Sequence, residues 1–191
     1  MKKKWKSFTI IIGLWLATII VIEIISTNPR DAVSEIPPKP PPIITSIHTN
    51  LSKIIQQKQP KLDPIITKRI TKSIEKYAKK FNLPPELVLC IIDKESTFKP
   101  TAVSKAGCKG LMQINPVAHP EKLKKLNVKG AEIFYIDNNI HLGCIILFEY
   151  YKKTKSITKS LYKYLGANNK KYVNDILSEF SEILVRKEAK K

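Results

Sequence analysis

Apolar side chains recur at intervals of three and four residues along most of the chain from Asp63 onward, which is the spacing of amphipathic helices. Asp63 followed by Pro64 predicts the start of the first of these helices, and Asn82 predicts its end. No alternating pattern of useful length indicates a strand, although a small β element between residues 99 and 109 remains open. The pattern therefore predicts an all-α, mainly helical domain.

Three more helices are predicted downstream. One is expected to be capped by Asp137 or Asn138, and Gly143 within it leaves room for another backbone to approach closely. Residues 157–165 and 172–184 supply the other two. Upstream of Asp63, residues 43–58 also carry apolar side chains at helical spacing, which predicts a short amphipathic helix that packs on the domain.

The helix predicted between Pro84 and Thr97 carries an acid at the end of its apolar face. Its inward positions are Leu87, Val88, Ile91, Ile92 and Glu95. Burial and the negative end of the helix dipole both disfavour a charged carboxylate, so the pKa of Glu95 is expected to be raised. A proton retained near neutral pH is what a general acid needs. The plain alternative is a partly exposed glutamate at a helix end.

The residues that follow Glu95 change this picture. The segment from Leu83 to Gln113 contains a Glu-Ser pair at Glu95 and Ser96 and a Gly-Leu-Met-Gln turn at residues 110–113. Residues 138–143 read Asn-Asn-Ile-His-Leu-Gly, and Tyr-Leu-Gly follows at residues 164–166. In this order, over about residues 63–184, the motifs resemble the lytic transglycosylases of the soluble-transglycosylase type, which have a goose-lysozyme-like fold. The resemblance implies a lysozyme-like domain that cleaves peptidoglycan.

The resemblance also implies roles for individual residues. Glu95 becomes the catalytic acid, and the substrate-binding residues are expected to be Ser96, Met112, Gln113, Asn139 and Tyr164. Gln113 has an amide that can both donate to and accept from sugar groups. Tyr162 is a rival for Tyr164, because the family's Asn after the tyrosine is replaced here by Leu165. Ser96, Met112 and Asn139 also have plain alternatives as helix-end or core residues.

The three cysteines are an odd number for a domain that is expected to face an oxidising compartment. The resemblance places the segments of Cys108 and Cys144 beside the cleft, which favours a disulfide between them and leaves Cys90 as a buried thiol. All three remaining reduced is the alternative. His48, His119 and His141 lack the spacing of metal ligands and are expected at the surface, so neither a metal nor a cofactor is predicted.

No second carboxylate falls in the motif segments, although glycosidases normally use two. In the family, one glutamate protonates the leaving oxygen and then accepts a proton from the sugar's 6-hydroxyl. The product is a 1,6-anhydromuramoyl end, formed without water. The resemblance therefore implies a non-hydrolytic, lyase-type cleavage of the link between N-acetylmuramic acid and N-acetylglucosamine.

The N-terminus has the composition of a membrane signal. Lysines precede an apolar run in residues 8–25, no small-residue cleavage site follows it, and prolines dominate residues 37–42. We expect a basic cytoplasmic segment at 1–7, a transmembrane anchor at 8–25, a proline-rich linker at 26–62, the catalytic domain at 63–185 and a basic tail at 186–191. Lysines ahead of the anchor predict an inner-membrane protein whose domain faces the periplasm and wall.

The formal net charge of +18 on 191 residues fits a polyanionic cell envelope as well as it fits nucleic acid, but most of the lysines are expected to form a solvated surface without a specific partner. No nucleic-acid motif is present, which argues against nucleic acid as the partner. The resemblance implies peptidoglycan strands as the partner, the N-terminal run implies the membrane, and an envelope machine remains open as a protein partner. A lytic transglycosylase is the function that these patterns favour. A hydrolytic muramidase of the same fold and a catalytically weak glycan-binding or scaffold module of a secretion machine remain open.

Overall fold

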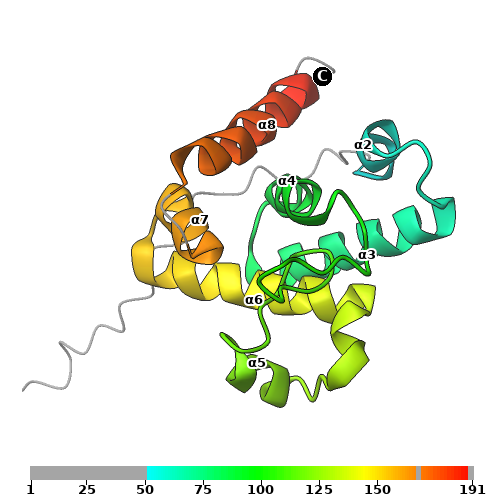
Figure 1. Cartoon of the computed structure of the whole chain (residues 1–191). Coiled ribbons are helices and arrows are strands. Elements are labelled where there is room, and N and C mark those ends of the chain that lie inside the picture. Colours follow the sequence, from blue (N-terminus) through cyan, green and yellow to red (C-terminus); the bar gives the residue numbers. More distant parts are fainter. Residues whose placement is uncertain (1–50, 167–168, 189–191) are drawn as a thin grey trace, which may run out of the picture. The chain divides into compact units, whose positions relative to one another are not determined.

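The computed structural model describes residues 51–166 and 169–188 (Figure 1). The predicted cytoplasmic segment, anchor and proline run lie outside these residues. The described chain is helical, as predicted from the spacing of its apolar residues. Its elements are α2 (Leu51–Lys58), α3 (Pro64–Phe81), α4 (Pro85–Ser96), α5 (Pro120–Lys125), the short 3-10 helix η1 (Gly130–Phe134), α6 (Ile136–Thr154), α7 (Ile157–Leu165) and α8 (Lys170–Glu188).

Helix α3 begins and ends where its sequence predicts. The Asp63 carboxylate accepts hydrogen bonds from the backbone of Ile65 at 2.6 Å and of Ile66 at 3.4 Å, which satisfies two free N–H groups of the first turn. Asn82 closes the helix in the left-handed conformation, with φ of 53°.

The predicted cap of α6 was wrong by two to three residues, because Tyr135 occupies the cap position, the helix begins at Ile136, and no side chain caps it. The Asp137 side chain is engaged elsewhere: it accepts hydrogen bonds from Ser73, Lys76 and Tyr77 of α3. The carboxylate therefore joins two helices instead of capping its own.

Helix α4 lies at the centre of the helical body and is buried on more sides than one apolar face predicts. Every residue from Glu86 to Ile92 is buried, and the helix contacts α2, α3 and α8. A helix that is apolar all round is typical of a core position. Helix α2 confirms the C-terminal half of the amphipathic helix predicted over residues 43–58, since its Leu51 and Ile55 are buried in the same core. Residues 43–50 of that prediction lie outside the described residues.

A sharp turn follows α4. Thr97 and Phe98 are consecutive residues with positive φ, at 52° and 59°, and the Phe98 side chain is fully buried. Left-handed backbone is uncommon for a β-branched residue, so the burial of Phe98 helps to hold this turn. In the following loop, Lys109 forms isolated β-bridges with Val103 and Ile114. The β element left open by the sequence is thus limited to these bridges within the described residues.

The turn at residues 110–113 is fastened to α6 by one buried amide. Asn139 is fully buried and accepts a hydrogen bond from the Met112 backbone at 2.7 Å. Its amide nitrogen donates to the carbonyls of Lys109 and Ile133, both at 2.9 Å. A Cβ at Gly110 would lie 2.2 Å from that nitrogen, so the contact also requires glycine. The Asn139 side chain therefore fixes the position of the turn relative to α6.

A second close contact joins α6 to the same turn. A Cβ on Gly143 would lie 2.3 Å from the Met112 sulfur and 2.9 Å from its Cβ. The prediction that Gly143 allows a close approach is confirmed, and the approaching group is the Met112 side chain.

Among the described residues, none of the helices is both long enough and apolar enough to cross a membrane.

Gly143→Ala is expected to destabilise the protein by about 1–3 kcal/mol, because the new methyl overlaps the fully buried Met112. Helix propensity alone predicts the opposite sign, since alanine is favoured over glycine inside a helix by about 1 kcal/mol. Urea unfolding measures the difference. Lys153→Ala on the exposed face of α6 is the control and should change stability by less than roughly 0.5 kcal/mol. A stabilised Gly143→Ala variant would contradict the packing described here.

Candidate active site

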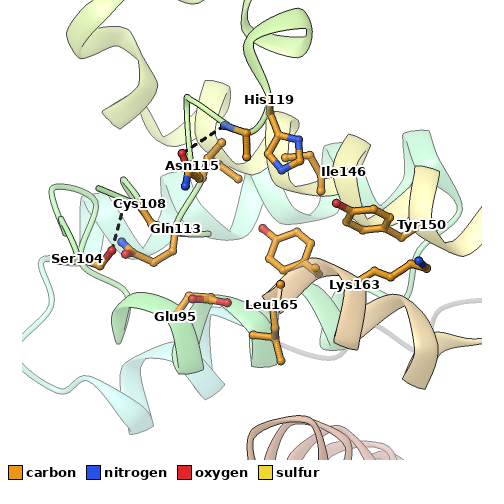
Figure 2. A pocket seen from close by; sticks show the side chains of 14 residues that line it. Glu95, Ser104, Cys108, Gln113, Asn115, His119, Ile146, Tyr150, Lys163 and Leu165 are labelled. Atoms are coloured by element: carbon orange, nitrogen blue, oxygen red, sulfur yellow. Dashed lines mark hydrogen bonds between the residues drawn. The ribbon is translucent and has the colours of Figure 1, made fainter. Parts of the chain in front are cut away.

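Glu95 occupies the last turn of α4, and its side chain points into a cleft (Figure 2). The helix brings it there because the preceding turns are held in the core. The chain then turns away at Thr97 and Phe98. The carboxylate is thus placed at the boundary between the core and the cleft.

Burial raises the pKa of Glu95 to about 7. The cause is desolvation, which disfavours the charged carboxylate. The nearby Tyr172 hydroxyl acts in the opposite direction, because it favours the charged form. Burial is the larger effect, so a substantial fraction of Glu95 holds its proton near neutral pH. The direction predicted from the sequence agrees with this result.

Tyr172, near the start of α8, is a site residue that the sequence did not reveal. Its periodic spacing predicts only a place on the apolar face of that helix. The hydroxyl is buried, lies against Glu95 and has no hydrogen bond of good geometry to any residue that the structure describes. Burial and the Glu95 charge raise the pKa of Tyr172, so it stays protonated and remains a donor. An unpaired buried donor is costly, which makes it available to the carboxylate or to a ligand.

The cleft has a volume of about 450 Å³ and is formed by α4, the loop after it, α6 and α7. Figure 2 shows Glu95 on the α4 side, with His119 and Tyr150 on the side of α6. Glu95 is the only carboxylate among the described residues that line the cleft. The lining consists of Glu95, Ser104, Cys108, Gln113, Ile114, Asn115, Ala118, His119, Ile146, Tyr150, Lys163, Tyr164, Leu165 and Gly166.

Gln113 lines the cleft, as its predicted role requires. Its amide nitrogen donates to the backbone carbonyls of Gly110 at 2.9 Å and Ala102 at 3.3 Å. The residue is held in left-handed backbone, with φ of 46°. Because the nitrogen is engaged, the amide oxygen is the group left for a ligand.

Tyr164 also lines the cleft, whereas its rival Tyr162 does not. The Tyr164 hydroxyl donates to the backbone carbonyl of Met112 at 2.8 Å. Burial raises the pKa of Tyr164 well above its ordinary value, so this donor keeps its proton. Tyr164 therefore connects α7 to the turn that Asn139 holds from α6.

Three predicted substrate-binding residues do not line the cleft. Ser96 is buried, and its hydroxyl donates to the Ile92 carbonyl at 3.1 Å. Met112 and Asn139 are both fully buried. Asn139 holds the turn that carries Gln113, the Met112 side chain packs against Gly143, and Ser96 bonds within its own helix.

Two residues that line the cleft were not predicted to do so. His119 was expected at the surface, and it instead precedes α5 and lines the cleft. Burial lowers the pKa of His119, so its neutral form is favoured. Lys163 also lines the cleft, although it had no predicted role. His141 lies outside the cleft and stacks on Tyr77, with ring centroids 4.2 Å apart.

The predicted disulfide between Cys108 and Cys144 is absent, because all three cysteines are free in the structure. Cys108 lines the cleft, while Cys144 is fully buried in α6. Burial raises the pKa of Cys144 to about 12 and also raises the pKa of Cys90. These two thiols therefore stay protonated and behave as small core residues.

Comparisons with known proteins found a family and similar solved structures. No curated protein matches the chain significantly. Among solved structures, the inactive Glu-to-Gln mutant of lytic transglycosylase Slt from Pseudomonas aeruginosa is similar, with a TM-score of 0.51 and 20% identity over 62% of this chain and 24% of that one. A 70-kDa soluble lytic transglycosylase in complex with bulgecin A gives a TM-score of 0.46 and 22% identity, over 58% of this chain and 18% of that one.

The chain thus spans about a quarter of the length of the first of these proteins and less of the second. The likeness to the Slt structure shows a shared fold in the matched part. The family described as transglycosylase SLT domain matches residues 72–175, which include Glu95, the turn at 110–113 and Tyr164. Because this match covers more than half of the 191 residues, the chain belongs to the transglycosylase SLT domain family.

Proposed function

We propose that this protein is a peptidoglycan lytic transglycosylase in which Glu95 acts first as an acid and then as a base. The observation that carries the proposal is Glu95, the one carboxylate that lines the cleft in the described part of the chain, whose pKa of about 7 lets it exist in both forms at neutral pH. Family membership supports the same activity.

The proposed reaction needs one proton carrier and no water. Glu95 gives its proton to the glycosidic oxygen between N-acetylmuramic acid and N-acetylglucosamine, and the bond from that oxygen to the muramoyl C1 breaks. The 6-hydroxyl oxygen of the same muramoyl residue then bonds to C1 and passes its proton to the Glu95 carboxylate. The glutamate is returned to its starting form, and the product carries a 1,6-anhydro ring. An attacking group already attached to the sugar gains from proximity.

The surrounding side chains have supporting roles in this proposal. Tyr172 stabilises the carboxylate formed after the first proton transfer, because a protonated hydroxyl favours the charged form. The Gln113 amide oxygen is placed to accept from a sugar hydroxyl or acetamido group. Ser96, Met112 and Asn139 act by holding Glu95 and the turn in place.

We also propose that the apolar run at residues 8–25 is an uncleaved inner-membrane anchor, with the domain facing the periplasm and wall. The support is the composition of that run and the lysines ahead of it. The intact mass of the protein from the membrane fraction should correspond to the whole chain. A mature chain that begins between residues 26 and 35 would contradict the anchor.

Glu95→Gln is expected to abolish lysis of purified sacculi, because glutamine keeps the shape of the side chain but has no transferable proton. The loss should exceed tenfold and reach about 10²-fold or more, the usual contribution of a general acid. Turbidity or zymogram assays measure it. Glu75→Gln, which changes an exposed carboxylate on α3, is the matched control and should retain activity. Lysis within tenfold of wild type by Glu95→Gln would reject the assignment.

The same variant predicts a pH-dependent change in stability. Folding raises the pKa of Glu95 from 4.5 to about 7, so the folded state favours the protonated form. Stability from this group is complete below pH 4.5 and is lost as the pH rises through 7. Relative to wild type, Glu95→Gln should gain about 3 kcal/mol in unfolding free energy between pH 4 and pH 8. Urea unfolding of both proteins at the two pH values tests this, and a difference independent of pH would contradict the burial of Glu95.

A further inference from the structure

Helix α3 exposes a face that is almost entirely basic. Its 18 residues contain six cations and a single acid, Glu75. All six cations are exposed, because the opposite side of the helix packs in the core. We call this set the α3 basic face: Lys68, Arg69, Lys72, Lys76, Lys79 and Lys80.

Most of these charges are unpaired. Lys68, Arg69, Lys72 and Lys79 have no ion-pair partner among the residues that the structure describes. Cations left unpaired on one side of a helix create a positive potential that favours an anionic partner.

Two of the lysines are held in place by neighbouring side chains. Lys76 lies 3.0 Å from the Asp137 carboxylate and sits over the Tyr77 ring. Lys80 sits over the Phe81 ring, and its Nζ is 3.2 Å from the ring nitrogen of His141. Positions that are already restricted lose less conformational entropy when a ligand binds.

The α3 basic face lies on the far side of α6 from the cleft. His141 of α6 contacts Tyr77 and Phe81 of α3, whereas Tyr150 of α6 lines the cleft. These two α6 residues are nine positions apart, so they point to opposite sides of the helix. No residue of α3 is among those that line the cleft. A ligand can therefore occupy the α3 basic face while the cleft is filled.

We propose that the α3 basic face is a second, non-catalytic binding site for peptidoglycan, which it contacts through the carboxylates of the peptide stems. This proposal rests on the proposed function for the identity of the polymer. Cations four residues apart are spaced by about 6 Å along the helix, so the face presents a row of charges. A row suits a polymer with repeated carboxylates better than a single small anion.

Other polyanions fit the face less well. Proteins that bind single-stranded nucleic acid offer aromatic faces for stacking, but Tyr77 is buried and Lys80 covers Phe81. Helices that lie on membranes carry a broad apolar face, whereas Ile65 is the only large apolar residue exposed on α3. Carboxylates on a hydrated polymer require neither feature.

The consequence is a difference between insoluble and soluble substrates. Sacculi present many stems near each cleavage site, so contacts at the α3 basic face keep the enzyme on the polymer between cleavages. A short soluble glycan that only fills the cleft gains nothing from this face.

The test compares two triple variants of the full chain that lose the same charge. Lys68→Gln, Lys72→Gln and Lys79→Gln neutralise half of the α3 basic face, and Lys124→Gln, Lys125→Gln and Lys159→Gln neutralise three exposed lysines on α5 and α7. Glutamine has a helix propensity close to that of lysine, so the helices are expected to persist. Both sets are placed in the Glu95→Gln chain in mild detergent, and retention on sacculi is measured by sedimentation at low and moderate salt.

We expect the α3 variant to bind sacculi roughly tenfold more weakly or worse, and the control to bind nearly as the parent does. Amidation of the carboxylates of the sacculi should weaken the binding of the Glu95→Gln chain by as much as the three α3 substitutions do. If both triple variants bind sacculi equally weakly, net charge alone explains the binding and the proposal is overturned. The proposal is also overturned if either the α3 substitutions or amidation of the sacculi leaves the retention of the protein unchanged.

A second readout separates this proposal from the proposed function. With Glu95 intact, the α3 variant should lose activity on sacculi but keep it on short soluble glycans. Equal loss on both substrates would count against a separate site. If the wild type lyses neither substrate, the proposed function fails, while the retention assay still decides the role of the α3 basic face.

Discussion

The desolvation of one carboxylate is the constraint on which the site depends. Glu95 is held near the core because the preceding turns of α4 are buried on all sides. Water stabilises a charged carboxylate by solvating it, and the loss of that solvation brings the pKa of Glu95 to about 7. The same burial that costs stability at neutral pH supplies the protonated form that acid catalysis requires. The protonated form of Glu95 is therefore kept at neutral pH at a cost in the free energy of unfolding.

The turn at residues 110–113, which presents Gln113 to the cleft, is held by close contacts that leave it little freedom to move. Asn139, Gly110 and Gly143 bring α6 and the turn together so closely that neither glycine can carry a side chain without a shift. Tyr164 adds a hydrogen bond to the Met112 carbonyl from α7. Gln113 is thereby presented to the cleft from a turn fixed by two helices, which is the kind of rigid support that a preorganised site needs.

The elements that depend on local sequence patterns, such as helix caps and helical spacing, were predictable from the sequence. The cap at Asp63, the end of α3 at Asn82 and the helix that carries Glu95 follow from spacing and capping chemistry. The motif resemblance identified Gln113 and Tyr164, which line the cleft.

The contacts between distant segments were not predictable in the same way. Tyr172 meets Glu95 only because α8 packs on α4, and its spacing is that of an ordinary core residue. Asn139 was assigned to the substrate, yet its amide satisfies backbone groups from two other segments. The disulfide assignment failed for a related reason: Cys108 and Cys144 belong to segments near the cleft, but one lines it and the other is in the core. Helical periodicity reports which side of a helix is buried and leaves its partner undetermined.

In the proposed reaction, Glu95 alone carries out both proton transfers, and the substrate's own hydroxyl takes the place of water. The most direct measurement is mass spectrometry of the muropeptides released from sacculi by the wild-type protein. The account predicts 1,6-anhydromuropeptides, which are lighter by one water than muropeptides with reducing ends. Borohydride-reducible ends as the main product would show that water attacks, and they would contradict the account.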